Sequence, residues 1–137
     1  MNEYYIPISI LASIAAAHLI KEIIYVLRTK TFSWQVLFQT GGMPSSHSAA
    51  TWALATSILY TQGMTALFWT STLLAAIVSL DAFRVRQSVG EQATLLNKLS
   101  EELSLEEKTR IVLGHTPLQV AIGGVMGFSI ATILYLL

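Results

Sequence analysis

The sequence predicts an all-α integral membrane protein, a bundle of about four transmembrane helices with an amphipathic interfacial helix between spans three and four. Two observations support this prediction. Of the 137 residues, 53% are hydrophobic and only 12% are charged, which is too apolar for an ordinary soluble domain of this length. The apolar residues also fall in long blocks, each close to the roughly 20 residues that a helix needs to cross a bilayer. We therefore expect residues 1–137 to form one membrane-embedded domain.

Four apolar blocks account for the four expected spans. The first covers residues 4–27, and the second, 44–60, is short and follows a pair of glycines. The third covers 64–83 and the fourth 117–137. Small residues recur at every fourth position of the last block, which predicts close contact with a neighbouring helix. These small residues are Gly123, Gly127 and Ala131.

An amphipathic pattern separates the third block from the fourth. Apolar residues recur there at helical spacing among polar ones, which is typical of a helix lying at a membrane surface. The apolar positions are Val85, Val89, Ala93 and Leu96.

Basic residues indicate how the bundle is oriented. Apart from Lys21, all of them lie in two connections, one after the first block and one between the third and fourth. With four spans these connections share one side of the membrane, and an excess of Lys and Arg marks that side as cytoplasmic. The formal net charge is zero, so the chain has no electrostatic footprint for nucleic acid. It contains no cysteine, which excludes disulfide and thiol chemistry.

The stretch 41–48, Gly-Gly-Met-Pro-Ser-Ser-His-Ser, combines residues that bind oxyanions with the start of a helix. The glycines let the backbone approach a ligand closely, and the free N–H groups of a helix N-terminus attract a phosphate-like anion. Ser45 and Ser46 add hydroxyl donors, and His47 is a titratable group where a general acid would stand. The structural alternative is a glycine turn, a serine N-cap and an incidental histidine. The stretch alone does not choose between them.

Two basic residues share one face of the first block. Lys21 and Arg28 are seven residues apart, which is two helical turns or about 10 Å along the axis. Both side chains can therefore converge on one anion. The alternative is that they extend to lipid headgroups. That explanation suffices for Arg28 alone, whereas Lys21 lies deeper, where a charge is costly and usually functional.

Polar residues also border the third and fourth blocks. Asp81 ends the third block and is followed by Arg84 and Arg86; an ion pair that fixes helix packing is the structural alternative for them. His115 stands at the entrance of the fourth block, as His47 does for the second. In a four-span bundle these ends meet on one surface, where cations can bind a phosphate and histidines can transfer protons or attack. The histidines lack a short ligand spacing, so we expect no metal site.

With these residues assembled, the chain resembles the phosphatidic acid phosphatase type 2 superfamily, which also contains vanadium-dependent haloperoxidases. The resemblance is closer to its short bacterial and plastid members, the divergent branch. The superfamily signature has three parts: Lys-x6-Arg-Pro, Pro-Ser-Gly-His and Ser-Arg-x5-His-x3-Asp. Lys21 and Arg28 match the first spacing, with Thr29 in place of proline. Residues 44–47 match the second part, with Ser46 in place of glycine.

The third part of the signature departs most. Arg110 precedes His115 by one residue fewer than the pattern has, and Gln119 stands where the aspartate belongs. The divergent branch is matched better, from the first span to the last. Its matching positions are 41–49, Asp81 with 85–86, 90–93 with Asn97, and 114–117.

The resemblance implies hydrolysis of a phosphate monoester or pyrophosphate through a phosphohistidine, without a metal or other cofactor. His115 would be the nucleophile, and His47 the acid that protonates the leaving oxygen. The missing aspartate normally orients the nucleophilic ring; Gln119 could orient it without neutralising it, and Asp81 could replace the aspartate from a neighbouring helix. The phosphate would be held by Lys21, Arg28, Ser45, Ser46 and either Arg110 or Arg86.

The expected substrate is a phosphorylated membrane lipid, because the bundle has no soluble lobe. Phosphatidylglycerophosphate, phosphatidate and polyprenyl diphosphates are the candidates. The competing class is a non-catalytic membrane protein that binds phosphate headgroups or assists assembly, and the departure at Gln119 supports it. A transporter is a weaker option, since one cleft in four spans leaves little room for alternating access unless the chain forms a homo-oligomer. We expect a bacterial inner membrane protein with its site facing the cytoplasm.

Overall fold

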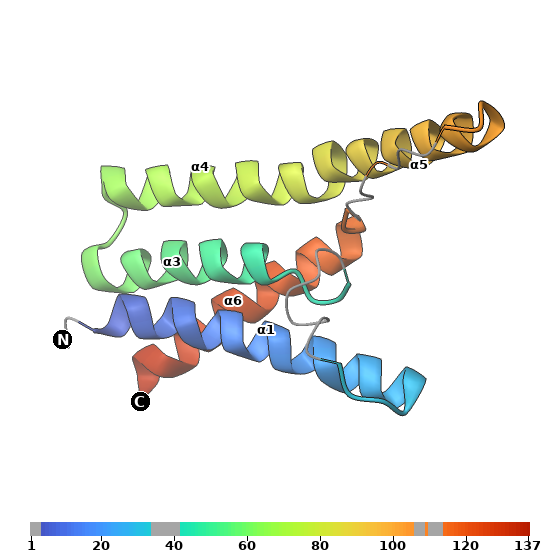
Figure 1. Cartoon of the computed structure of the whole chain (residues 1–137). Coiled ribbons are helices and arrows are strands. Elements are labelled where there is room, and N and C mark those ends of the chain that lie inside the picture. Colours follow the sequence, from blue (N-terminus) through green and yellow to red (C-terminus); the bar gives the residue numbers. More distant parts are fainter. Residues whose placement is uncertain (1–3, 34–41, 106–108, 110–113) are drawn as a thin grey trace.

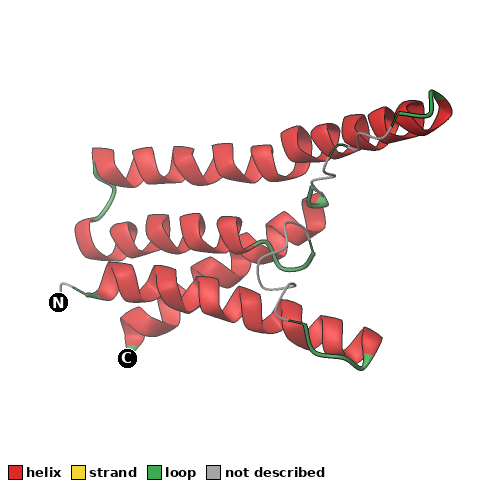
Figure 2. Ribbon diagram, in the orientation of Figure 1, coloured by secondary structure: helices red, strands yellow, loops and turns green. Residues whose placement is uncertain are grey.

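The fold is helical in the computed structural model (Figure 1), which describes residues 4–33, 42–105, 109 and 114–137. No strand occurs among these residues (Figure 2), so the all-α prediction is confirmed for them. In chain order the helices are α1 Tyr5–Thr29, α3 Ser46–Gln62, α4 Ala66–Leu80, the π-helical turn η1 Asp81–Val85, α5 Arg86–Glu102 and α6 Pro117–Leu136.

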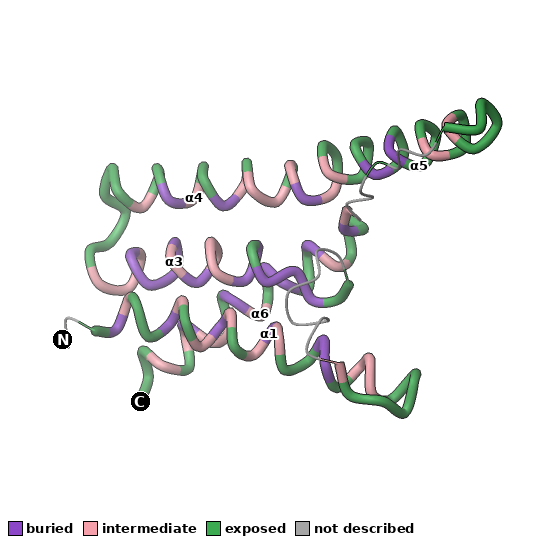
Figure 3. The backbone as a smooth tube through the Cα atoms, in the orientation of Figure 1, coloured by how far each residue is buried: buried purple, intermediate pink, exposed green. Residues whose placement is uncertain are grey.

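Helix α3 is the centre of the bundle, because α1, α4 and α6 all pack against it. Its small residues allow this close packing, and Ala49, Ala53 and Ser57 are completely buried. Large apolar side chains point outward instead: Leu11 on α1 is 65% exposed and Leu73 on α4 is 61% exposed. Figure 3 shows exposed positions recurring along the outer sides of α1 and α4. An interior of small residues with an apolar exterior is typical of helices packed in lipid.

The small-residue spacing predicted on α6 is confirmed as its contact with α3. A Cβ atom added at Gly123 would collide with the carbonyl oxygen of Ser45, and one at Gly127 with that of Ala49. Ala131 is fully buried one turn further on. Only glycine allows the two backbones to approach this closely. The first of these contacts fixes α6 against the start of α3, where the candidate site lies.

Among the described residues, three helical segments are long and apolar enough to cross a membrane: Tyr5–Thr29, Ala66–Glu102 and Pro117–Leu136. Helix α3 has 17 residues, fewer than the roughly 20 that a full span needs. It begins at Ser46, two residues after the start of the second apolar block, and it continues to Gln62. The described structure therefore has three candidate spans around a shorter central helix.

The predicted amphipathic segment forms α5, which continues directly from α4 through η1. The result is one helical segment of 37 residues, Ala66–Glu102, in place of a span followed by a separate helix. Figure 1 shows α5 projecting beyond the end of the bundle. Gly90 and Ala93 are its buried residues.

Candidate functional site

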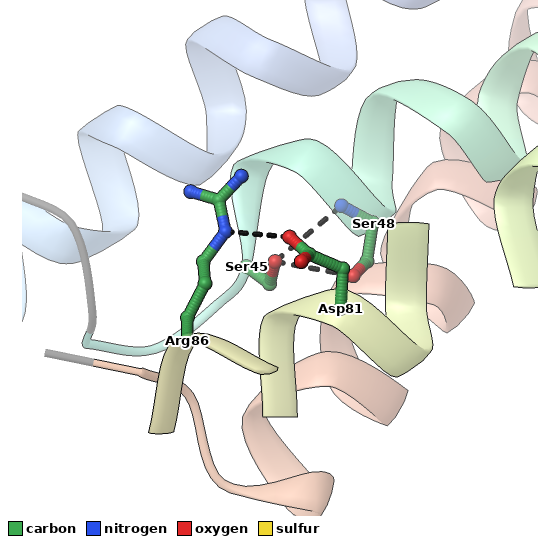
Figure 4. A network of polar contacts seen from close by, with 4 residues as sticks. All are labelled: Ser45, Ser48, Asp81 and Arg86. Carbon is green, nitrogen blue, oxygen red and sulfur yellow. Dashed lines mark hydrogen bonds and ion pairs between the residues drawn. The ribbon is translucent and has the colours of Figure 1, made fainter. Parts of the chain in front are cut away.

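The N-terminus of α3 is held by its own serine residues. Ser45 is the N-cap, and its hydroxyl oxygen accepts hydrogen bonds from the Ser48 backbone N–H at 3.4 Å and the Ser48 hydroxyl at 3.1 Å (Figure 4). The Ser45 N–H donates to the carbonyl oxygen of Gln119 at 3.1 Å, which joins α3 to α6. Pro44 precedes the N-cap and therefore lies outside the first helical turn. Ser45 is fully buried, and in the described structure its hydroxyl oxygen is used to cap α3.

His115 is held at the entrance of α6 by two backbone carbonyl groups. Its backbone N–H donates to Ala82 O at 2.9 Å, and its ring Nδ1 lies 3.0 Å from Gly42 O. A carbonyl oxygen can only accept, so Nδ1 must carry the proton in this hydrogen bond. In the neutral ring Nε2 then has a free lone pair. The ring is therefore oriented with Nε2 as its available nucleophilic or basic atom.

The π-helical turn η1 explains why Ala82 can bind His115. The Arg86 N–H donates to Asp81 O, five residues earlier, so it does not bond to Ala82 O in the usual α-helical pattern. The Ala82 carbonyl accepts the His115 N–H instead. Gly114 permits this approach, because a Cβ atom there would collide with the backbone of Gln87. Single π-helical turns inside longer helices are frequent at functional sites.

The surroundings of His115 favour its neutral form. The residue is only 6% exposed, and burial lowers the pKa of its ring below the ordinary value of 6.5. The positive charge of Lys21 lowers this pKa further, while hydrogen bonding by Gly42 and the Gln119 side chain acts in the opposite direction. The net direction is downward, so the ring is mainly unprotonated at neutral pH. A neutral ring with a free Nε2 can attack an electrophile.

A buried cation lies near both histidines. Lys21 is 6% exposed, and its charge acts on the rings of His47 and His115. His47 is exposed on the first turn of α3, and the charges of Arg86 and Asp81 also act on it. The structure thus brings together residues from α1, α3, the α4–α5 helix and the start of α6, as the sequence predicted for one end of the bundle.

Asp81 and Arg86 form the ion pair that was the structural alternative for this region. The Arg86 Nε donates to Asp81 Oδ2 at 2.7 Å (Figure 4). Both side chains are about one-third exposed, so the pair lies at an open edge of the site. The carboxylate of Asp81 therefore binds a cation, and its neighbour Ala82 is the residue that contacts His115.

The other predicted site residues occupy different surroundings. Arg28 is exposed in the last turn of α1 and forms no hydrogen bond or ion pair with another described residue. Ser46 is buried at the first position of α3. The side-chain oxygen of Gln119 accepts the Thr116 N–H at 3.0 Å, which completes a capping box at the start of α6. Arg110 lies outside the described residues.

Sequence reasoning missed two groups at the site and one buried carboxylate on α1. The two groups are the carbonyl oxygens of Gly42 and Ala82, which every residue possesses and which therefore leave no sequence signal. The carboxylate belongs to Glu22, which is 6% exposed; its Oε1 accepts the Ser33 N–H at 3.0 Å, while Oε2 has no hydrogen-bond partner in the described structure. A carboxylate inside an apolar block could have identified it. Among the described residues, no three His, Cys, Asp or Glu side chains gather as metal ligands.

Two comparisons with known proteins match nearly the whole chain. The Divergent PAP2 family matches residues 2–130. The chain is also 36% identical over 144 aligned positions to the uncharacterised membrane protein YuiD of Bacillus subtilis (strain 168), covering 93% of this chain and 91% of YuiD. No solved structure matches the chain significantly. The match along nearly the whole chain shows that this membrane protein belongs to the divergent PAP2 family.

Proposed function

We propose that this protein is a membrane phosphatase that hydrolyses a lipid phosphate monoester or pyrophosphate through a phosphohistidine at His115. The observation that carries the proposal is the hydrogen bond between His115 Nδ1 and Gly42 O, 3.0 Å long. It fixes the tautomer that leaves Nε2 free, as a nucleophilic histidine requires. The Gly42 carbonyl thereby takes over the orienting role of the aspartate that Gln119 replaces in the superfamily signature.

The first chemical step transfers the phosphoryl group to the enzyme. The lone pair of His115 Nε2 attacks phosphorus, a P–N bond forms and the bond from phosphorus to the leaving oxygen breaks. The electron pair stays with that oxygen, which takes a proton from protonated His47. The Nδ1 proton stays hydrogen-bonded to the Gly42 carbonyl oxygen. The dipole of this carbonyl group stabilises the positive charge of the phosphorylated ring.

The second step returns the enzyme to its starting state. Neutral His47 accepts a proton from water as the water oxygen attacks phosphorus. The P–N bond breaks, its electron pair returns to His115 Nε2, and inorganic phosphate leaves. No metal is needed, because fixed cations offset the charge of the phosphoryl oxygens. Among the described cations, Lys21 acts electrostatically on both histidines and Arg86 on His47. Ser46 directly precedes His47, and Arg28 and Arg110 complete the proposed set.

The lengths of the helices support a membrane setting for the proposed chemistry. With a rise of about 1.5 Å per residue, the 17 residues of α3 extend about 26 Å, close to the roughly 30 Å hydrocarbon core. We infer that α3 completes a four-span bundle together with the backbone leading into it, and that α5 lies at the interface. The basic connections favour a site on the cytoplasmic side of a bacterial inner membrane. A phosphorylated lipid in that leaflet would present its headgroup at the depth of His115.

A non-catalytic headgroup-binding protein is the second candidate. One observation favours it: the Gln119 side chain, at the position of the superfamily aspartate, is engaged in the helix cap through Thr116. Such a protein would bind phosphate groups through the same cations and release no product.

Phosphate release by the purified full-length chain separates the two candidates. We expect hydrolysis of phosphatidate in detergent micelles, loss of all activity in His115→Ala, and full activity in the distant control Tyr60→Phe. Removal of divalent ions by a chelator should leave the rate unchanged. An active His115→Ala variant would contradict the phosphohistidine, and so would a chelator-sensitive activity restored by a divalent ion. Vanadate binding by a wild-type protein that releases no phosphate would favour the non-catalytic headgroup-binding protein.

A further inference from the structure

Two apolar grooves flank the N-terminal half of α6. The larger, with a volume of about 470 Å³, lies where α4 and α6 both border α3. Its lining includes Trp52, whose indole N–H donates to Ser79 Oγ at 3.4 Å. The smaller, about 360 Å³, lies between α1 and α6 and is lined at α1 by Ile20. Apart from the Trp52–Ser79 pair, the side chains that line the grooves are apolar.

Both grooves begin at the candidate site. Phe83 lines the larger groove and directly follows Ala82, whose carbonyl holds the backbone of His115. Met43 lines the smaller groove and directly follows Gly42, whose carbonyl holds the His115 ring. Each groove therefore starts beside one of the two backbone groups that position the proposed nucleophile.

A ridge on α6 separates the two grooves. Ala121 and Val125 line both of them, and Val125 is 66% exposed. Along the larger groove, Pro117 and Phe128 are eleven residues apart, which corresponds to about 16 Å of helix. That length is close to half of the roughly 30 Å hydrocarbon core. The larger groove thus has the depth of one leaflet, which is the reach of one hydrocarbon chain of a membrane lipid.

We propose that the two grooves bind the two hydrocarbon chains of a two-chain lipid phosphate, one on each side of the α6 ridge, with the phosphate at His115. This inference rests on the proposed function and narrows its substrate class. A lipid with a single long chain would leave one groove unoccupied. Two grooves that start beside one headgroup position and run along the same ridge suit a glycerol-like branch point at the His115 end of α6.

Chain-dependent kinetics test this proposal on the full-length protein in detergent. The substrates are a chain-free aryl phosphate, octyl phosphate and dioctanoyl phosphatidate. Each methylene that leaves water for an apolar site raises affinity by up to about fourfold. We expect kcat/KM to rise from the aryl to the one-chain substrate and again to the two-chain substrate.

Variants separate groove binding from partition into micelles. Ala121 lines both grooves, so the larger side chain of Ala121→Trp should obstruct both and abolish the rise in kcat/KM relative to the aryl phosphate. Ile122 lines only the smaller groove, so Ile122→Trp should remove the gain from the second chain. Ile133→Trp, on the same helix and outside both grooves, is the matched control and should behave as wild type. Each kcat/KM value is divided by the value for the aryl phosphate with the same variant, so that a loss of folded protein cancels from the ratio.

Several outcomes would overturn the proposal. Equal kcat/KM values for the one-chain and two-chain substrates would do so, and so would unchanged ratios in Ala121→Trp, as expected if bulk lipid or a second copy of the chain fills the grooves. If the wild-type protein hydrolyses none of the three substrates, the proposed function fails, and lipid binding measured by thermal stabilisation then tests the grooves. Greater thermal stabilisation by dioctanoyl phosphatidate than by octyl phosphate, lost in Ala121→Trp, would support the grooves, and equal stabilisation would refute them.

Discussion

The two ends of the bundle use polar groups in opposite ways. At the end where both termini lie (Figure 1), tyrosine side chains complete the packing. The Tyr5 hydroxyl donates to Ala131 O at 2.7 Å, and the Tyr60 hydroxyl lies 3.2 Å from Thr132 Oγ1. The rings of Tyr60 and Tyr135 stack with their centroids 4.5 Å apart. Polar atoms at this end bond to helices that already touch, so they stabilise the fold.

At the opposite end, buried polar groups keep atoms that form no hydrogen bond within the described structure. Lys21, Glu22 and His115 are each 6% exposed. Glu22 Oε2 has no hydrogen-bond partner in the described structure, and the bond to Gly42 leaves His115 Nε2 available. Burying such groups costs free energy unless they are satisfied. The polar groups of the tyrosine end therefore serve packing, whereas the proposed reactivity lies at the histidine end. Substitutions at the two ends should therefore affect different measurements.

The largest expected effect after loss of the nucleophile concerns His47. His47→Ala should slow hydrolysis of an alkyl phosphate by about 10²–10⁴-fold, because the alkoxide leaving group needs a proton. An aryl phosphate, whose leaving group departs without help, should be affected much less. The unfolding midpoint should stay close to that of wild type. Equal losses of kcat for both substrates would mean that His47 binds phosphate and does not act as the acid.

Closer to the tyrosine end, Gly127→Ala should have the opposite effect to His47→Ala: it should lower stability and leave activity intact. The added Cβ would meet the carbonyl oxygen of Ala49, and such overpacking typically costs about 1–3 kcal/mol. We expect a lower unfolding midpoint in detergent, with the activity per folded molecule retained at low temperature. An unchanged midpoint would show that the α3–α6 contact is looser than described.

The pH dependence of activity should follow His115. Because burial and Lys21 lower the pKa of its ring below 6.5, the proposed nucleophile should stay unprotonated down to mildly acidic pH. The acidic limb of kcat/KM for an aryl phosphate, which needs little help from an acid, should therefore have its midpoint below 6.5. Below that midpoint the rate should fall about tenfold per pH unit. A limb centred above 6.5 would contradict the described surroundings of His115.

The smallest expected effect belongs to a single hydrogen bond at the tyrosine end. Tyr5→Phe removes the donor to Ala131 O and should lower stability by about 0.5–1.5 kcal/mol. Activity should remain at the wild-type level, measured alongside Tyr60→Phe as a second variant of the same end. A loss of activity without a loss of stability would show that the two ends are coupled.

Much of the fold and part of the candidate site could be predicted from the sequence. Hydropathy predicted the helices, and the spacing of Gly123 and Gly127 predicted the α6 contact, because both follow from local pattern. The meeting of Lys21, His47 and the start of α6 followed from topology alone.

Other features depend on tertiary structure. The π-helical turn that frees the Ala82 carbonyl, and the carbonyl of Gly42 that orients His115, involve only backbone atoms, which no residue pattern reveals. For Ser45 the sequence left two roles open, phosphate binding and a serine N-cap, and its position as the N-cap depends on where α3 begins. The continuity of α4 with α5 was missed because the change from apolar to amphipathic composition suggested a boundary between two helices.

The position of the phosphoryl group on His115 tests the central claim most directly. Rapid quenching of the wild-type protein with a ³²P-labelled substrate should trap an acid-labile, alkali-stable phosphoprotein. Because Nδ1 is bound to the Gly42 carbonyl, nuclear magnetic resonance of the trapped protein should assign the phosphoryl group to Nε2 of His115. Phosphorylation at Nδ1, or on a residue other than His115, would contradict the account.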